Sequence, residues 1–199
     1  MKRIAQLSFV LILFASINLL SQPADNLSIF NNLIDNSIVK VDSSAAASKG
    51  NLPVKLSLPQ PLELLRSKII LAFQQKGYLV RENNDGSSFL NYSLMDANVS
   101  YRDPFKDGLF GSVLTDREIK LEGSYFIATN SGVNQPVYFT ETYTDTVKID
   151  DIPFLENRSL PFTQGEIPQP PLLSNLLEPA IVIGALITTI ILFFTVRSK

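Results

Sequence analysis

The 199-residue sequence contains no cysteine and no histidine. The lack of cysteine excludes disulfides, thiol catalysis, zinc–thiolate sites and the lipid-bearing cysteine of bacterial lipoproteins. The lack of histidine excludes the usual Ser-His and His-ligated metal sites. An enzyme built from this chain would depend on carboxylates, lysine, tyrosine or serine alone. We therefore expect a non-enzymatic protein with neither a metal ion nor a cofactor.

The sequence also has no surplus of positive charge, with 17 Lys and Arg against 19 Asp and Glu. All 19 acidic residues lie between Asp25 and Glu178, together with only 13 of the basic ones, so this middle part has a net charge of −6. An acidic surface argues against nucleic acid as a partner. A modest negative charge of this kind also simply keeps a domain soluble.

The N-terminus begins with a charged pair, Lys2 and Arg3, followed by an apolar stretch over residues 4–20. This order is typical of a secretory signal. We assign residues 1–22 to a signal peptide, although the sequence shows no clean cleavage site and an uncleaved anchor is the alternative. Either way, the acidic middle of the chain is expected outside the cytoplasm.

Residues 180–196 form a second apolar segment, without a single charged side chain. At about 1.5 Å per residue, its length is the short limit for a bilayer span. Arg197 and Lys199 follow it, and cations beside a span are retained in the cytoplasm. The sequence therefore predicts a single-pass helix at 180–196 in contact with membrane lipid, a cytoplasmic tail at 197–199 and a periplasmic domain.

Between these segments, hydrophobic periodicity predicts the order α-β-α-β-β-β-β within one extracytoplasmic domain, residues 25–150. This order indicates an α+β fold, with a mainly antiparallel four- to five-stranded sheet and two helices on one face. The apolar alternation slips near Met95, which predicts a β-bulge there. The expected helices span 28–46 and 62–77, and the expected strands span 54–58, 78–80, 89–101, 119–127 and 136–149. A turn at 83–86 and another at 130–134 are expected to close two hairpins.

Six prolines fall within residues 151–179. Because proline-rich segments favour an extended backbone, this part is expected to be a spacer between the domain and the membrane helix.

The expected loop at 102–115 is unusual for its apolar side chains. Such side chains are not needed for a turn. In one interpretation the loop folds back over the sheet and is half-buried. In the other it is a docking patch for another envelope protein or for a membrane surface. The candidate interaction residues are Phe105, Leu109, Phe110, Val113 and Leu114.

Ser37 and Lys40 have the Ser-x-x-Lys spacing of penicillin-binding enzymes. The companion Ser-Asp-Asn and Lys-Thr-Gly motifs are missing, and the domain is small for such an enzyme. The spacing is therefore interpreted as an ordinary helix surface.

The expected helix from Leu62 to Gly77 leads directly into Tyr78-Leu79-Val80-Arg81-Glu82, and long strands with an excursion from Tyr101 to Asp116 follow. This order of elements resembles periplasmic α/β envelope-assembly accessory modules of the lipopolysaccharide-assembly (LptE-like) or curli-pore type, over roughly residues 54–149. The resemblance implies an assembly or scaffolding role in a bacterial cell envelope. Those relatives are typically lipid-anchored, whereas this chain has no anchoring cysteine.

These expectations lead to two main hypotheses about function, beside a third possibility, a carboxylate hydrolase, which would need two facing acids in a cleft, drawn from Glu118, Glu122, Glu141 or Asp145. The first is a membrane-tethered, non-enzymatic accessory or scaffold protein of the bacterial envelope, which binds another envelope protein through its sheet or the loop at 105–114. The second is a small-molecule or lipid-binding domain, which would need a deep apolar pocket between the helix at 62–76 and the sheet.

Overall fold

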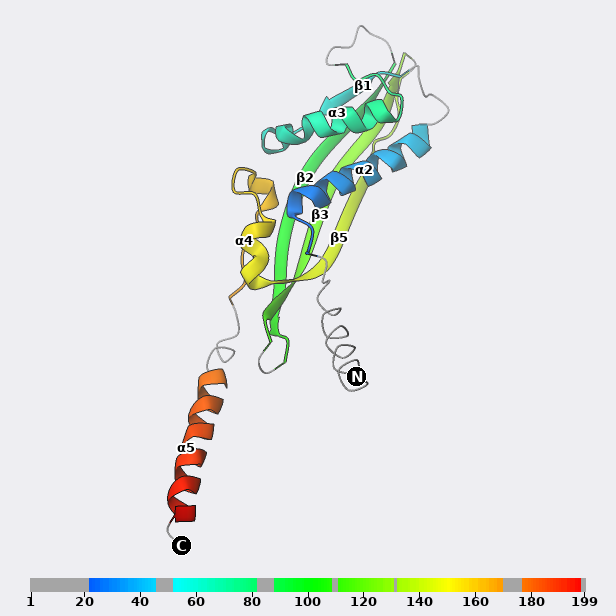
Figure 1. Ribbon diagram of the computed structural model, residues 1–199. Helices are drawn as coiled ribbons and strands as arrows, with labels where there is room; N and C mark the ends of the chain where they lie inside the picture. The colour runs from blue at the N-terminus through cyan, green and yellow to red at the C-terminus, as the bar shows by residue number, and fades with distance from the viewer. Residues whose placement is uncertain are drawn as a thin grey trace, which may run out of the picture.

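The computed structural model describes residues 22–45, 52–81, 88–108, 111–130, 132–169 and 177–197 (Figure 1). The expected signal peptide, except for its last residue, lies outside the described residues, and so does the expected turn at 83–86. Leu109 and Phe110 of the candidate interaction loop also lie outside them, as do the last two residues of the tail.

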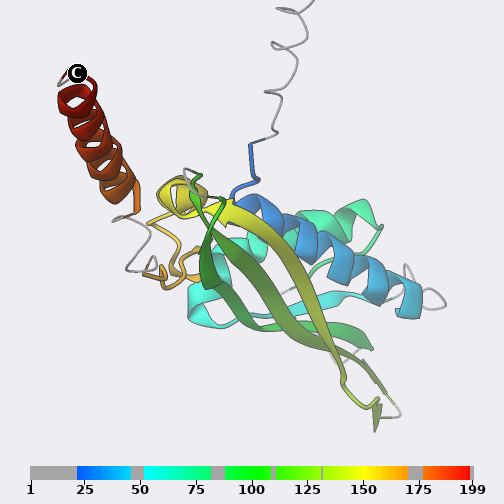
Figure 2. The same ribbon diagram turned by 90° about the horizontal axis from the view of Figure 1, so that it is seen from below.

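One five-stranded sheet forms the centre of the molecule. Its first strand is parallel to the second, and the other pairings are antiparallel. The sheet curves strongly along its length (Figure 2). The order is β1-β2-β3-β4, with β5 pairing to β3. The strands are β1 (Val54–Ser57), β2 (Phe89–Lys106), β3 (Val113–Thr129), β4 (Gly132–Val133) and β5 (Val137–Lys148).

Helix α2 (Asn26–Ala45) forms where the apolar residues recur every three or four positions. Phe30, Ile34 and Ile38 lie on one side of it and are buried in the core. Asp25 precedes the helix, and its carboxylate accepts hydrogen bonds from the Ser28 backbone N–H at 2.8 Å and the Ser28 hydroxyl at 2.7 Å. The predicted first helix is therefore confirmed, beginning two residues ahead of the expected start with Asp25 as its N-cap.

The second predicted helix consists of a 3₁₀ segment η3 (Gln60–Leu65) followed by α3 (Arg66–Gln75). A proline in the first turn suits the start, because its missing N–H needs no partner there. Gly77 has φ +86°, a left-handed conformation that lets the chain leave the helix sharply.

Helices α2 and α3 cover the same face of the sheet (Figures 1 and 2). Phe73 of α3 meets Tyr92 of β2 edge to face at 5.2 Å, and Tyr92 stacks on Phe139 of β5 at 5.5 Å. The core thus runs from the helices across the sheet, and the expected mixed α+β fold is confirmed.

Two predictions about the strands are wrong. Residues 78–80 form only an isolated bridge, in which Val80 is parallel to Val54 of β1. Val54 N–H donates to Leu79 O at 2.7 Å, so β1 occupies the place beside β2 that the expected hairpin required. The loop expected at 102–115 is also shorter, because β2 runs to Lys106 and β3 begins at Val113.

Two register shifts allow the pairing of β2 with β3 to continue beyond the strand ends expected from the sequence. The shift between Leu94 and Asp96 is the bulge predicted near Met95. A second shift lies between Arg102 and Phe105, and Asp103 within it has φ +50°. The irregular backbone absorbs the extra residues, so pairing continues beyond the point where the apolar alternation ends.

The expected proline-rich spacer begins with folded structure, in η4 (Ile149–Asp151), α4 (Ile152–Leu155) and η5 (Pro161–Thr163). Ile152 and Phe162 are buried, and Phe162 meets Phe30 edge to face at 5.4 Å. Prolines stand in the first turns of α4 and η5, where a fixed φ favours a helical start. The spacer is therefore shorter than its expected bounds of 151–179, since residues up to about 165 belong to the domain.

Helix α5 (Leu177–Arg197) contains the segment expected to cross the membrane and is set apart from the sheet (Figures 1 and 2). Among the described residues, no helix combines the length and the apolar character that crossing a membrane requires. The structure therefore does not support the expected single-pass span at 180–196.

Candidate functional site

The structure places three of the five candidate interaction residues at one end of the β2–β3 pair. Phe105 pairs with Leu114, and the next pair outward joins Lys106 and Val113. Phe105 is 43% exposed. Phe105, Val113 and Leu114 are thus strand residues and not members of a free loop. That they bind a partner stays a prediction.

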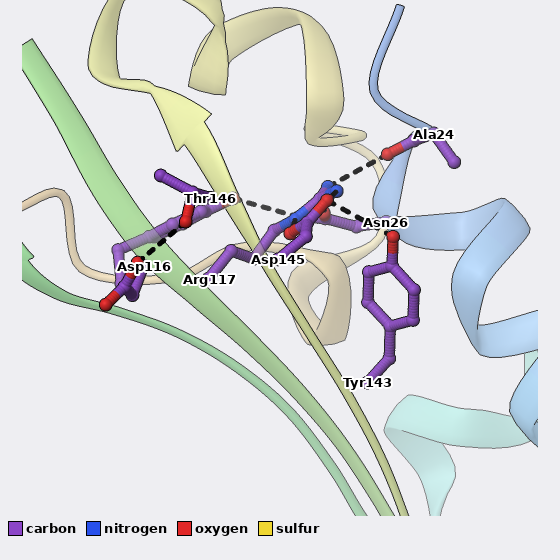
Figure 3. Close-up of polar contacts among 8 residues, drawn as sticks. Ala24, Asn26, Asp116, Arg117, Tyr143, Asp145 and Thr146 are labelled. Carbon is purple, nitrogen blue, oxygen red and sulfur yellow. Dashed lines mark hydrogen bonds and ion pairs between the residues drawn. The ribbon is translucent and has the colours of Figure 1, made fainter. Parts of the chain in front are cut away.

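Near the same end, β3 and β5 are joined by a buried ion pair (Figure 3). The Arg117 side chain is fully buried, and Arg117 Nε donates to Asp145 Oδ1 at 2.8 Å while Nη2 lies 2.5 Å from Asp145 Oδ2. This bidentate geometry compensates the cost of removing a guanidinium from water. The Tyr143 ring centroid lies 5.9 Å from Cζ of Arg117 and adds a cation–π contact.

The same guanidinium holds the chain just before α2. Arg117 Nη1 donates to Ala24 O at 2.9 Å and to Asn26 Oδ1 at 2.7 Å. The Asn26 amide donates in turn to Tyr101 OH at 3.0 Å and to Thr163 O at 2.8 Å. Five segments of the domain therefore meet at one polar cluster, which we call the Arg117 clamp: Ala24, Asn26, Tyr101, Arg117, Asp145 and Thr163.

The Arg117 clamp stabilises the fold and is not arranged as a binding site. Its side chains hydrogen-bond one another, and burial raises the pKa of Tyr101 to about 12, against the lowering effect of the Asn26 hydrogen bond. The residues it uses were not singled out in the sequence. A signal was present, because Arg117 occupies an inward position of the same alternation as Ile119 and Leu121, and a buried cation requires a partner.

A surface hollow of about 400 Å³ lies at this cluster, lined by residues of β2, β3 and β5 that include Arg117 and Asp145. Arg102 is paired with Glu118 at 2.9 Å, and the Thr146 hydroxyl donates to Asp116 at 2.9 Å. Its principal polar groups thus pair with one another. In the described ranges no group of three or more acidic residues is placed to hold a metal ion.

The side chains of Ser37 and Lys40 each contact other residues of the domain. Ser37 is fully buried, donates to Ile34 O at 2.8 Å and shares a 2.7 Å hydrogen bond with Tyr92 OH. Lys40 instead reaches the buried Glu141 of β5, with Nζ 2.5 Å from Oε1, and compensates its charge. Burial also raises the pKa of Tyr92. A substrate has no access to the Ser37 hydroxyl in this arrangement.

The interior between α3 and the sheet is filled by the chain's own side chains. Ile69, Phe73 and Leu90 are buried there. A hollow at this place lies on the surface instead and is lined by Leu56, Arg66, Ile70, Val80 and Arg81. The described residues thus offer no apolar chamber for the small-molecule hypothesis.

The outer edge of the sheet is the most accessible binding feature. Strand β5 has 12 residues, and among the described strands it pairs only with β3. The pairing runs without a register shift from Val137 to Lys148. Thr140, Thr142, Thr144 and Thr146 are exposed, and they alternate with the buried Phe139, Glu141 and Val147 on the opposite face. A long, regular edge of this kind can accept a further strand.

Comparison with known proteins shows similarity to solved structures only. No protein-family profile matches the chain, and no curated protein sequence matches it. A minor lipoprotein from Acinetobacter baumannii has a TM-score of 0.35 and 12% identity, covering 64% of this chain and 87% of its own. Rare lipoprotein B from Shewanella oneidensis has a TM-score of 0.29 and 11% identity, covering 70% and 98%. At these TM-scores the likeness carries no argument about function.

Proposed function

We propose that this chain is a non-enzymatic accessory protein of the bacterial cell envelope, attached to the membrane through α5, that acts by contact with another envelope protein. The free edge of β5 is the observation that carries the proposal. An exported domain of this size that contains no cysteine fits a bacterial envelope better than a eukaryotic secretory pathway.

The edge supports binding of a protein strand because its backbone groups are available on a long strand without a register shift. Natural sheets usually protect such an edge with bulges, prolines or short strands. None of these interrupts the pairing of β5 with β3, and the opposite edge strand β1 has only four residues. The inward carboxylates of β5 are neutralised within the domain by Lys40 and Arg117. An added strand would therefore meet threonines instead of unpaired charge.

Attachment through α5 is supported by its exposed side chains. Ten large apolar residues between Ile181 and Phe194 are exposed on this helix. Apolar surface of this extent on a helix marks a contact with lipid or with another protein. The single-pass crossing expected from the sequence stays a prediction. Extraction of membranes with carbonate tests the attachment, since an α5 buried in lipid keeps the chain in the pellet.

Site-specific photo-crosslinking in intact cells tests the partner contact. A photoreactive phenylalanine replaces Thr144 on β5, and in a matched control it replaces Leu71, which is 52% exposed on α3. We expect a discrete adduct with an envelope protein at position 144 and none at position 71. Adducts at position 71 alone, or at neither position, would contradict the role of the edge.

A further inference from the structure

A second exposed aromatic lies close to the end of the sheet that carries Phe105. Phe154 of α4 is 80% exposed, although its neighbours Ile152 and Leu155 are buried. Across the sheet, Phe105 pairs with Leu114 and Leu114 pairs with Lys148, and α4 begins four residues after Lys148. Both views show α4 beside this end of β2 and β3 (Figures 1 and 2). We call this end of the sheet, with Phe105, Leu114 and Lys148, the α4 end.

The chain leaves the folded domain beside α4. The Gly165 N–H donates to Glu156 Oε1 at 2.8 Å, directly after α4. A Cβ built on Gly165 would lie 2.7 Å from Val99 O, so the backbone is packed against β2 at this point. The path of the chain toward α5 therefore starts from the same place as Phe154.

The length of the connection limits how far the domain stands from α5. Twelve residue steps join Gly165 to Leu177, the first residue of α5, and they span at most about 43 Å when fully extended. The 17 residues of β3 extend over roughly 55 Å. The tether is thus shorter than the sheet and holds the segment beside α4 within about 43 Å of α5.

The charges of the α4 end decide which kind of membrane surface it can contact. Residues 103–107 and 148–158 carry three basic and five acidic side chains. An anionic surface would be repelled by this balance, whereas apolar contact with a zwitterionic surface would not. The chemistry therefore points to Phe105 and Phe154 as apolar contacts with lipid, not to cationic recognition of headgroups.

We propose that the α4 end rests on the zwitterionic surface of the membrane that holds α5, with Phe105 and Phe154 inserted between the headgroups. This inference rests on the membrane attachment proposed above. It gives the domain a fixed orientation, in which the β3–β5 hairpin and the free edge of β5 point away from the bilayer toward a partner.

Single-tryptophan fluorescence tests the orientation, because the natural chain contains no tryptophan. The full-length chain carries Phe154→Trp or Phe105→Trp and is placed in nanodiscs of phosphatidylcholine, either plain or brominated at shallow acyl positions. Two reference variants accompany them: Ile187→Trp at the centre of α5, and Tyr138→Trp, which is 71% exposed and about 33 Å along β5 from Lys148.

We expect bromine to quench Phe154→Trp and Phe105→Trp by at least a third, to quench Ile187→Trp more strongly, and to leave Tyr138→Trp unchanged. Quenching of Ile187→Trp alone would overturn the inference and leave the membrane attachment intact. No quenching of Ile187→Trp would overturn both. The exposure of Phe154 makes its substitution compatible with folding, and far-UV circular dichroism of each variant verifies this.

Discussion

Arg117 and Asp145 stand directly opposite each other in the β3–β5 register, and their side chains form a bidentate ion pair although Arg117 is fully buried. Removing one member of a buried pair leaves an uncompensated charge inside the protein. The two hydrogen bonds at 2.8 and 2.5 Å therefore matter more for what their loss costs than for what they add.

We expect Asp145→Asn to lower the free energy of unfolding by roughly 3 kcal/mol. Urea unfolding of the detergent-solubilised chain, followed by far-UV circular dichroism, measures the change. Asp116→Asn on the outer face is the matched control and should stay within about 0.5 kcal/mol of the wild type. Adding Arg117→Met to Asp145→Asn should recover part of the loss, since the buried charge is then absent.

Asp25→Ala removes the cap of α2 and should cost about 1 kcal/mol, whereas Asp25→Ser should keep most of the stability. Partial burial raises the pKa of Asp25, but hydrogen bonds from the Ser28 N–H and hydroxyl outweigh it and hold the pKa below the usual 3.8. The contribution is thus fully present above pH 4 and is lost as the pH falls through the lowered pKa. A difference between wild type and Asp25→Ala that stays constant down to pH 2 would refute this account.

Two tyrosines should resist ionisation in alkali. Burial, together with the hydrogen bond to Asp42, raises the pKa of Tyr78 to about 12, and burial raises the pKa of Tyr101 to about 12. Their neutral forms stabilise the fold fully below pH 10, and this contribution is lost as the pH rises from about 10 to 12. Absorbance at 295 nm should show a late phase that coincides with loss of circular dichroism. Tyr101→Phe should shrink that phase.

Substitution of two glycines distinguishes the cost of backbone strain from the cost of a steric clash. Gly77 has φ +86° with open space around it, so Gly77→Ala should cost about 1 kcal/mol. A Cβ at Gly123 would lie 2.5 Å from Ser93 O and 2.3 Å from Phe139 Cζ. Because the β2 backbone has no room to move away, Gly123→Ala should cost about 3 kcal/mol. Equal urea midpoints for the two variants would contradict the close packing at Gly123.

Phe162→Ala tests whether the proline-rich segment belongs to the domain. The ring is buried against Phe30, so its removal should lower the free energy of unfolding by roughly 3 kcal/mol. Phe154→Ala, eight residues earlier in the same segment, is the control and should leave that free energy unchanged because the ring is 80% exposed. A spacer outside the fold would make the two variants equivalent.

Local patterns were sufficient to predict the elements whose stability is local. The spacing of Phe30, Ile34 and Ile38 predicted α2, and the alternation through Ile119 and Leu121 predicted the strand that pairs with β5. The slip near Met95 predicted the bulge, because an extra residue changes the phase of every side chain after it.

Contacts between distant residues were not predictable in the same way. Val80 pairs with Val54 across the whole of α3, and nothing in residues 78–80 distinguishes that pairing from a hairpin. Prolines 153 and 161 fit an extended spacer and a helical first turn equally well, and only the burial of Ile152 and Phe162 decides between them. The Arg117 clamp joins residues 28 to 137 positions apart, so no short window contains it.

The hydrogen bond from Asn26 to Thr163 has a consequence for biogenesis. In the export that the sequence predicts, one partner is among the first residues of the domain to cross the membrane, and the other follows 137 residues later. Until Thr163 arrives, the Asn26 amide lacks one of its two native acceptors and hydrogen-bonds water instead. We therefore expect the Arg117 clamp to be completed only when η5 joins the fold, shortly before α5 follows in the chain.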